Sequence, residues 1–138
     1  MVICSMKKSE CDDLISKFEK ENYSFGQAMR YIRQRKDLKI RKVAKEVGKT
    51  PTYISDIERD NNKPPEKELM KKILVALDIQ EIELQNCLYD LAARQRGRVS
   101  EDIAGYIMEH SDLRLVIRMV QQRNDGESFW AECVKKME

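Results

Sequence analysis

The feature that most constrains this fold is a pair of short helical segments that meet at a glycine between residues 40 and 59. Apolar residues recur at helical spacing through the first segment, and Gly48 follows where a helix favours a left-handed residue. Thr50 and Pro51 then suit the N-cap and the first position of a second helix. The small Ala44, four residues before the glycine, allows that second helix to cross close to the first. We therefore predict two short helices joined by a tight turn.

Such a pair is typical of a helix-turn-helix, in which the exposed N-terminal face of the second helix enters a DNA major groove. A generic helical hairpin would use the same glycine and the same apolar residues, Ile54 and Ile57. The motif by itself therefore leaves both interpretations open.

The rest of the chain predicts an all-α fold. It contains only five Gly and three Pro, and 36% of its residues are charged. Apolar stripes at helical spacing precede residue 22 and continue after residue 80, and Ser9, Ser100 and Ser111 are expected to cap three of the helices. The pattern thus favours a helical bundle with a further helical extension at the C-terminal end.

The sequence lacks the residues that several classes of enzyme and metalloprotein require. His110 is the one histidine, and Cys4, Cys11, Cys87 and Cys133 are too scattered for a CxxC or zinc motif. No phosphate-binding glycine motif and no GxSxG nucleophile motif occurs in the sequence. We expect no catalytic activity, no metal and no cofactor. The longest aliphatic run, Ile73 to Leu77, is too short to span a membrane, so we expect a cytoplasmic protein with four free thiols and no membrane contact.

Charge is distributed unevenly along the chain. Residues 22–79 carry nine Lys and five Arg against eight acidic residues, a net charge of +6, whereas residues 1–21 and 80–138 carry −1 and −3. A basic middle between acidic ends suggests that one part of the chain meets a polyanion. A solvated, lysine-rich surface would produce the same balance, so charge alone does not decide between the two.

A resemblance to a known family favours the first interpretation, in which the basic segment meets a polyanion. Residues 25–79 resemble the phage-repressor-like, or XRE-type, helix-turn-helix regulators. The matching features are the spacing from Arg33 to Leu38, "KVAKEVG" (42–48), "TPTYISDIER" (50–59), Pro64-Pro65 and "ILVALDI" (73–79). Residues 96–119 are similar, less specifically, to a helical extension of some such regulators. We therefore predict an N-terminal helix (1–21), an XRE-type DNA-binding domain (22–79), and a helical extension for dimerisation or partner binding (80–138).

The resemblance implies which residues meet DNA. Base contacts fall to Thr50, Pro51, Thr52 and Asp56, with Tyr53 beside them, and Asp56 could accept a hydrogen bond from cytosine. Asp56 could equally well only balance Arg59. Phosphate contacts fall to Arg41, Lys42, Lys49, Asn61, Asn62 and Lys63.

The resemblance also pairs Arg33 with Glu58, as a link that orients one helix on the other. The chain departs from the family pattern at Lys39-Ile40, where many members have Ser/Thr-Gln, so Arg41 is expected to replace a lost phosphate contact. Asp60 and Asp78 occupy positions usually held by glycine, and Asp tolerates left-handed geometry better than most residues.

The leading interpretation is a sequence-specific regulator, a repressor that binds a near-palindromic site on double-stranded DNA as a homodimer. The alternative is an antitoxin or other interaction module that uses the C-terminal helices to bind a partner protein. Tyr106, Phe129 and Trp130 are the candidate anchors of a dimer interface, because aromatic residues are enriched at interface hot spots. Those helices could instead pack back onto the first domain.

Overall fold

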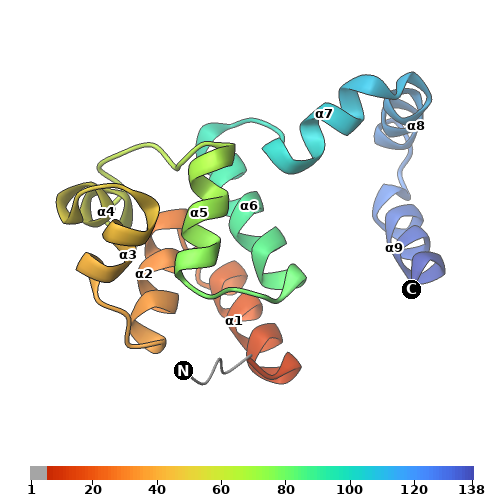
Figure 1. The fold of residues 1–138 in the computed structure, drawn as a ribbon. Helices are drawn as coiled ribbons and strands as arrows, with labels where there is room; N and C mark the ends of the chain where they lie inside the picture. Colours follow the sequence, from red (N-terminus) through yellow and green to blue (C-terminus); the bar gives the residue numbers. More distant parts are fainter. Residues whose placement is uncertain (1–5) are drawn as a thin grey trace. The chain divides into compact units, whose positions relative to one another are not determined.

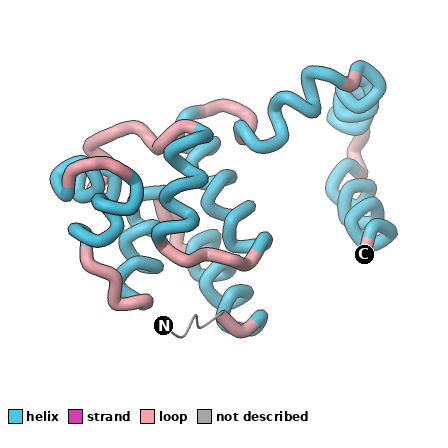
Figure 2. Tube along the Cα trace, in the orientation of Figure 1, coloured by secondary structure: helices cyan, strands magenta, loops and turns pink. Residues whose placement is uncertain are grey.

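The computed structural model describes residues 6–138, and this part of the chain is built of α-helices without strands (Figures 1 and 2). The all-α fold predicted from the sequence is therefore confirmed. The helices are α1 (Lys8–Lys20), α2 (Phe25–Arg35), α3 (Ile40–Val47), α4 (Pro51–Glu58), α5 (Lys67–Ala76), α6 (Ile82–Arg96), α7 (Glu101–Glu109), α8 (Ser111–Gln121) and α9 (Gly126–Met137). They divide into two compact units, one extending through Asp102 and the other comprising residues 103–138.

The first unit surrounds a single apolar core. Helix α2 packs on α4 and α6, α3 packs on α4 and α5, and α1 packs on α6 (Figure 1). The largest fully buried side chains come from all six of these helices, and they include Phe18, Phe25, Ile54, Ile73 and Leu88. The elements on either side of the helix-turn-helix thus share one core with it.

The first compact unit, which extends through Asp102, includes residues on both sides of the boundaries predicted at 21/22 and 79/80. Helix α1 buries Cys11, Leu14 and Phe18, and α6 buries Leu84 and Leu88, so each helix supplies the apolar stripe that the other needs. The physical boundary lies at 102/103 because the last buried stripe of this core is on α6.

Local signals explain where several helices begin and end. Gly48 has a φ of 73°, the left-handed conformation predicted for the end of α3. Asp60 and Asp78 have φ values of 60° and 53°, as expected of residues that stand in for glycine. Ser24 begins α2 with a capping box, since its hydroxyl accepts from the Gln27 N–H while the Gln27 side chain accepts from the Ser24 N–H.

Two predicted caps are wrong. Helix α1 begins at Lys8 with Lys7 at the N-cap, and α8 begins at Ser111 with His110 at the N-cap, in neither case with a side-chain capping bond. Ser9 and Ser111 therefore lie inside the first turns rather than before them. In both helices the preceding residue already has extended backbone geometry, so the helix begins one or two positions earlier than the serine suggests.

The second unit contains little core. Helix α8 packs against α9. Within residues 103–138, Val120 is the one large apolar residue whose side chain is buried. Ten of the thirteen exposed large apolar side chains of the described chain lie in this unit, Leu115, Met119 and Val134 among them.

Candidate nucleic-acid interface

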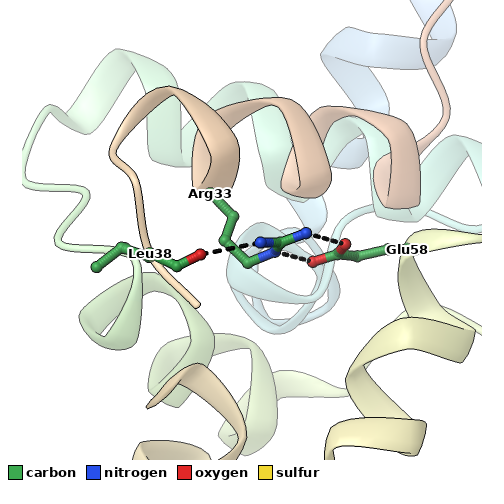
Figure 3. Close-up of polar contacts among 3 residues, drawn as sticks. All are labelled: Arg33, Leu38 and Glu58. Atoms are coloured by element: carbon green, nitrogen blue, oxygen red, sulfur yellow. Dashed lines mark hydrogen bonds and ion pairs between the residues drawn. The ribbon is translucent and has the colours of Figure 1, made fainter. Parts of the chain in front are cut away.

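A buried ion pair attaches the second helix of the motif to α2 (Figure 3). Arg33 Nε lies 2.6 Å from Glu58 Oε2, and Arg33 Nη2 donates to Glu58 Oε1 at 2.9 Å. The third nitrogen, Nη1, donates to the Leu38 carbonyl oxygen at 2.9 Å, which ties in the chain leading to α3. The side chains of Arg33 and Glu58 are only 10% and 3% exposed. A two-point contact of this kind sets both the position and the rotation of α4.

The turn between α3 and α4 has the close geometry of a helix-turn-helix. Ala44 is buried, and its carbonyl oxygen accepts the Lys49 N–H at 2.9 Å across the left-handed Gly48. Thr50 caps α4, with its Oγ1 accepting the Tyr53 N–H at 3.1 Å, and Pro51 occupies the first turn. The α3–α4 pair is therefore held by backbone geometry as well as by its apolar contacts.

The predicted DNA-binding residues lie along α3, α4 and the loop after α4. Most are exposed, whereas Tyr53, Asp56 and Asn62 are half-buried. The exposed set comprises Arg41, Lys42, Lys49, Thr50, Pro51, Thr52, Asn61 and Lys63. Lys49 Nζ lies 5.3 Å from the centre of the Tyr53 ring, a cation–π distance. Within residues 6–138, Arg41, Lys42 and Lys63 make no ion pair, so their charges are available to a phosphate backbone.

Asp56 has a partner within the chain. Its Oδ1 accepts a hydrogen bond from Arg59 Nη2 at 3.0 Å, and the two side chains are 30% and 55% exposed. This contact corresponds to the second alternative considered from the sequence, in which the Asp56 carboxylate balances the charge of Arg59. Reading of a cytosine by Asp56 would therefore require the carboxylate to share or exchange this contact.

Arg59 lies at the C-cap of α4, and its i,i+3 contact with Asp56 is one of the two alternatives weighed from the sequence. A second contact of the site was not predicted from the sequence. Asp60 Oδ2 accepts a hydrogen bond from the Ser24 hydroxyl at 2.7 Å, which joins the end of α4 to the start of α2. Nothing local in the sequence indicates that second contact.

The three aromatic candidates for a dimer interface all belong to α7 or α9, but they form two groups. Tyr106 stacks on His110 with ring centres 4.0 Å apart. Phe129 and Trp130 meet edge to face at 4.9 Å, and the Arg123 guanidinium lies 5.3 Å from the Phe129 ring centre. Arg123 also donates to both carboxylate oxygens of Asp125, and this hydrogen bonding lowers the pKa of Asp125.

Within residues 6–138, His, Cys, Asp and Glu side chains form no cluster of three or more that could hold a metal ion. No helix in the same range is both long enough and apolar enough to cross a membrane. Cys11, Cys87 and Cys133 carry free thiols, while Cys4 lies outside the described residues.

Comparison with known proteins identifies the class of domain. A family model described as helix-turn-helix matches residues 29–84, from the middle of α2 to the start of α6. A search of curated proteins gave no significant match. A search of solved structures gave none either. Residues 29–84 are thus an XRE-type helix-turn-helix, a DNA-binding domain of transcription regulators, and the generic helical hairpin is set aside.

Proposed function

We propose that this protein is a repressor that reads a near-palindromic DNA site as a homodimer, acts in the cytoplasm and performs no catalysis. The observation that carries the proposal is the exposed N-terminal turn of α4, which the buried Arg33–Glu58 pair holds in place. A fixed helix with a free polar face suits the major groove, which admits one α-helix.

Within this proposal the side chains divide into two roles. Thr52 and Asp56 contact base edges, through a hydroxyl, a methyl group and a carboxylate that can accept from cytosine. Arg41, Lys42 and Lys63 neutralise phosphates on either side of α4, since they are exposed and have no ion-pair partner within residues 6–138.

Selection of bound sequences from a random DNA pool tests this division. Thr52→Ala is expected to change the preferred base at one position, at a cost of ~1–3 kcal/mol for the original site. Arg41→Ala is expected to weaken all sequences about equally and to reduce the salt dependence of binding. Absence of salt-dependent binding to any DNA would refute the regulator function.

Asp56 needs a separate comparison because of its contact with Arg59. If Asp56 reads a base, Asp56→Ala changes sequence preference while Arg59→Ala leaves that preference intact. If Asp56→Ala instead strengthens binding to all sequences, the carboxylate acts only as a repulsive charge near phosphate and the assignment to base readout is wrong.

The homodimer is proposed from residues 103–138. Apolar positions on α8 cover about 200° of its circumference at 3.6 residues per turn, which is more than one neighbouring helix can cover. Leu115, Val116, Ile117 and Met119 are all exposed there, between 37% and 58%. A unit this small seldom folds without association or another stabilising contact. A second copy would supply the missing apolar surface and would also place two copies of α4 on one DNA site.

Sedimentation of the full chain measures the oligomeric state directly. The wild-type protein is expected to sediment as a dimer, and Leu115→Glu with Met119→Glu as a monomer that binds a palindromic site more weakly. Arg118→Glu on the polar side of α8 is the matched control and is expected to stay dimeric. A monomeric wild-type protein would refute the homodimer. Purification with a second small protein at equal stoichiometry would refute it in favour of the antitoxin interpretation.

A further inference from the structure

An open groove of about 1210 Å³ lies next to α4, the proposed recognition helix, and at the C-terminal end of α6. One side is formed by Tyr53 of α4 and by the loop from Asp60 to Glu66. The other side is formed by Gln95, Arg96 and Arg98, at and just beyond the end of α6. The groove thus joins residues proposed to contact DNA with residues outside the helix-turn-helix itself, all within the first compact unit.

Arg96 holds the two sides of the groove together. Its guanidinium donates to the carbonyl oxygens of both Pro64 and Pro65, and Nη1 lies 3.6 Å from a Glu101 carboxylate oxygen. The Arg96 side chain is only 10% exposed. It is therefore occupied within the protein and fixes the α4–α5 loop to the end of α6.

Arg98 and Lys63 differ from Arg96 because both are exposed and neither forms an ion pair within residues 6–138. The backbone of Arg98 is well defined, since Gly97 turns the chain with a φ of 69° and the Arg98 N–H donates to the Ala93 carbonyl oxygen at 3.1 Å. This is the Schellman pattern of a helix end. The well-defined backbone therefore holds the Arg98 guanidinium, which has no ion-pair partner within residues 6–138, at the groove.

The two acidic side chains that line the groove have other interactions. Asp60 accepts the Ser24 hydroxyl, and Glu66 is at the N-cap of α5, where the helix dipole favours a carboxylate. The cations without internal partners therefore determine what the groove can bind. A polyanion that continues past Tyr53 and the Asn61–Lys63 loop would reach Arg98 next.

We propose that Arg98 binds the DNA phosphate backbone, so that the end of α6 extends the DNA interface beyond the helix-turn-helix. The proposal rests on the DNA-binding function proposed above. A phosphate backbone is the favoured ligand because the groove is open and is continuous with the recognition helix. An Arg at this position adds affinity without sequence preference.

The test compares Arg98→Gln with Arg94→Gln in the full chain. Arg94 is also exposed and lies near the end of α6, but it does not line the groove, so it is the matched control. Affinity for a selected site and for random duplex DNA is measured across a salt series. Loss of one phosphate contact lowers the slope of log affinity against log salt by ~0.9 for each protomer bound.

Arg98→Gln is expected to lower that slope, whereas Arg94→Gln should keep the wild-type slope. Neither substitution should change the melting temperature. Between about 50 and 200 mM salt, wild-type affinity should fall roughly threefold more per protomer than that of Arg98→Gln. Arg98→Lys should retain the wild-type slope. An unchanged slope in Arg98→Gln, in a protein whose binding still depends on Arg41 and Thr52, overturns this proposal alone. Failure of the wild-type chain to bind DNA overturns the proposed function as well.

Discussion

Removal of the Glu58 carboxylate tests the buried link that holds α4 in its proposed DNA-binding position. In Glu58→Ala, Arg33 loses the two hydrogen bonds at 2.6 and 2.9 Å and keeps only the one to the Leu38 carbonyl oxygen. Its side chain is 10% exposed, so water cannot readily replace the carboxylate. The variant therefore leaves a positive charge buried and incompletely paired.

The size of the effect follows from that burial. Breaking a buried ion pair by removing one partner costs ~3–5 kcal/mol of stability. In a domain of this size each kcal/mol lowers Tm by roughly 4–8 °C, so the melting temperature should fall by at least about 12 °C. DNA affinity should fall at the same time, because α4 is no longer held against α2.

Thermal melting followed by circular dichroism measures the loss of stability, and a DNA-binding titration well below Tm measures the loss of affinity. The control is Asp56→Ala, which removes an ion pair whose side chains are 30% and 55% exposed. Exposed pairs contribute only ~0–1 kcal/mol, so the control should melt within a few degrees of wild type.

A double variant separates the unpaired charge from the loss of packing. Arg33→Met with Glu58→Leu removes both charges and keeps apolar volume, so it should be more stable than Glu58→Ala. A Glu58→Ala protein that melts as the wild type does would show that the pair contributes nothing to stability, and the reasoning from burial would fail.

Two further predictions concern close packing and a buried thiol. Gly26→Ala should destabilise the first unit strongly, because its Cβ would overlap the Ile57 carbonyl oxygen and lie 2.9 Å from that of Glu58. Gly105→Ala, where a Cβ meets open space, should be neutral or slightly stabilising, and urea unfolding measures the stability of both variants. Burial raises the pKa of Cys87 from 9.0 to about 11, so the folded chain holds this proton after the unfolded chain has released it, and stability falls as pH rises between these values. Urea unfolding at pH ~8 and ~10 should show a smaller loss in Cys87→Ala than in wild type, and equal losses would refute the assignment.

The sequence predicted the features that depend on residues a few positions apart. Gly48, Thr50 and Pro51 define the turn and the start of α4 because backbone conformation and capping are decided within one helical turn. The left-handed conformations of Asp60 and Asp78 were expected from the family resemblance, because glycine usually holds these two positions. Resemblance to a family added the longer-range pairing of Arg33 with Glu58, which local pattern alone does not contain.

The tertiary structure decided which apolar stripes belong together. From the sequence, α1 and α6 were assigned to separate regions, because an amphipathic stripe shows that a helix buries one face without showing which helix covers it. In the structure these two helices pack on each other and complete the first core. The positions of Arg96 against Pro64 and Pro65, and of Arg98 at the adjoining groove, follow from that packing. Pro64 and Pro65 lie some thirty residues from Arg96 along the chain, so only the folded arrangement of α6 against the bundle brings them together.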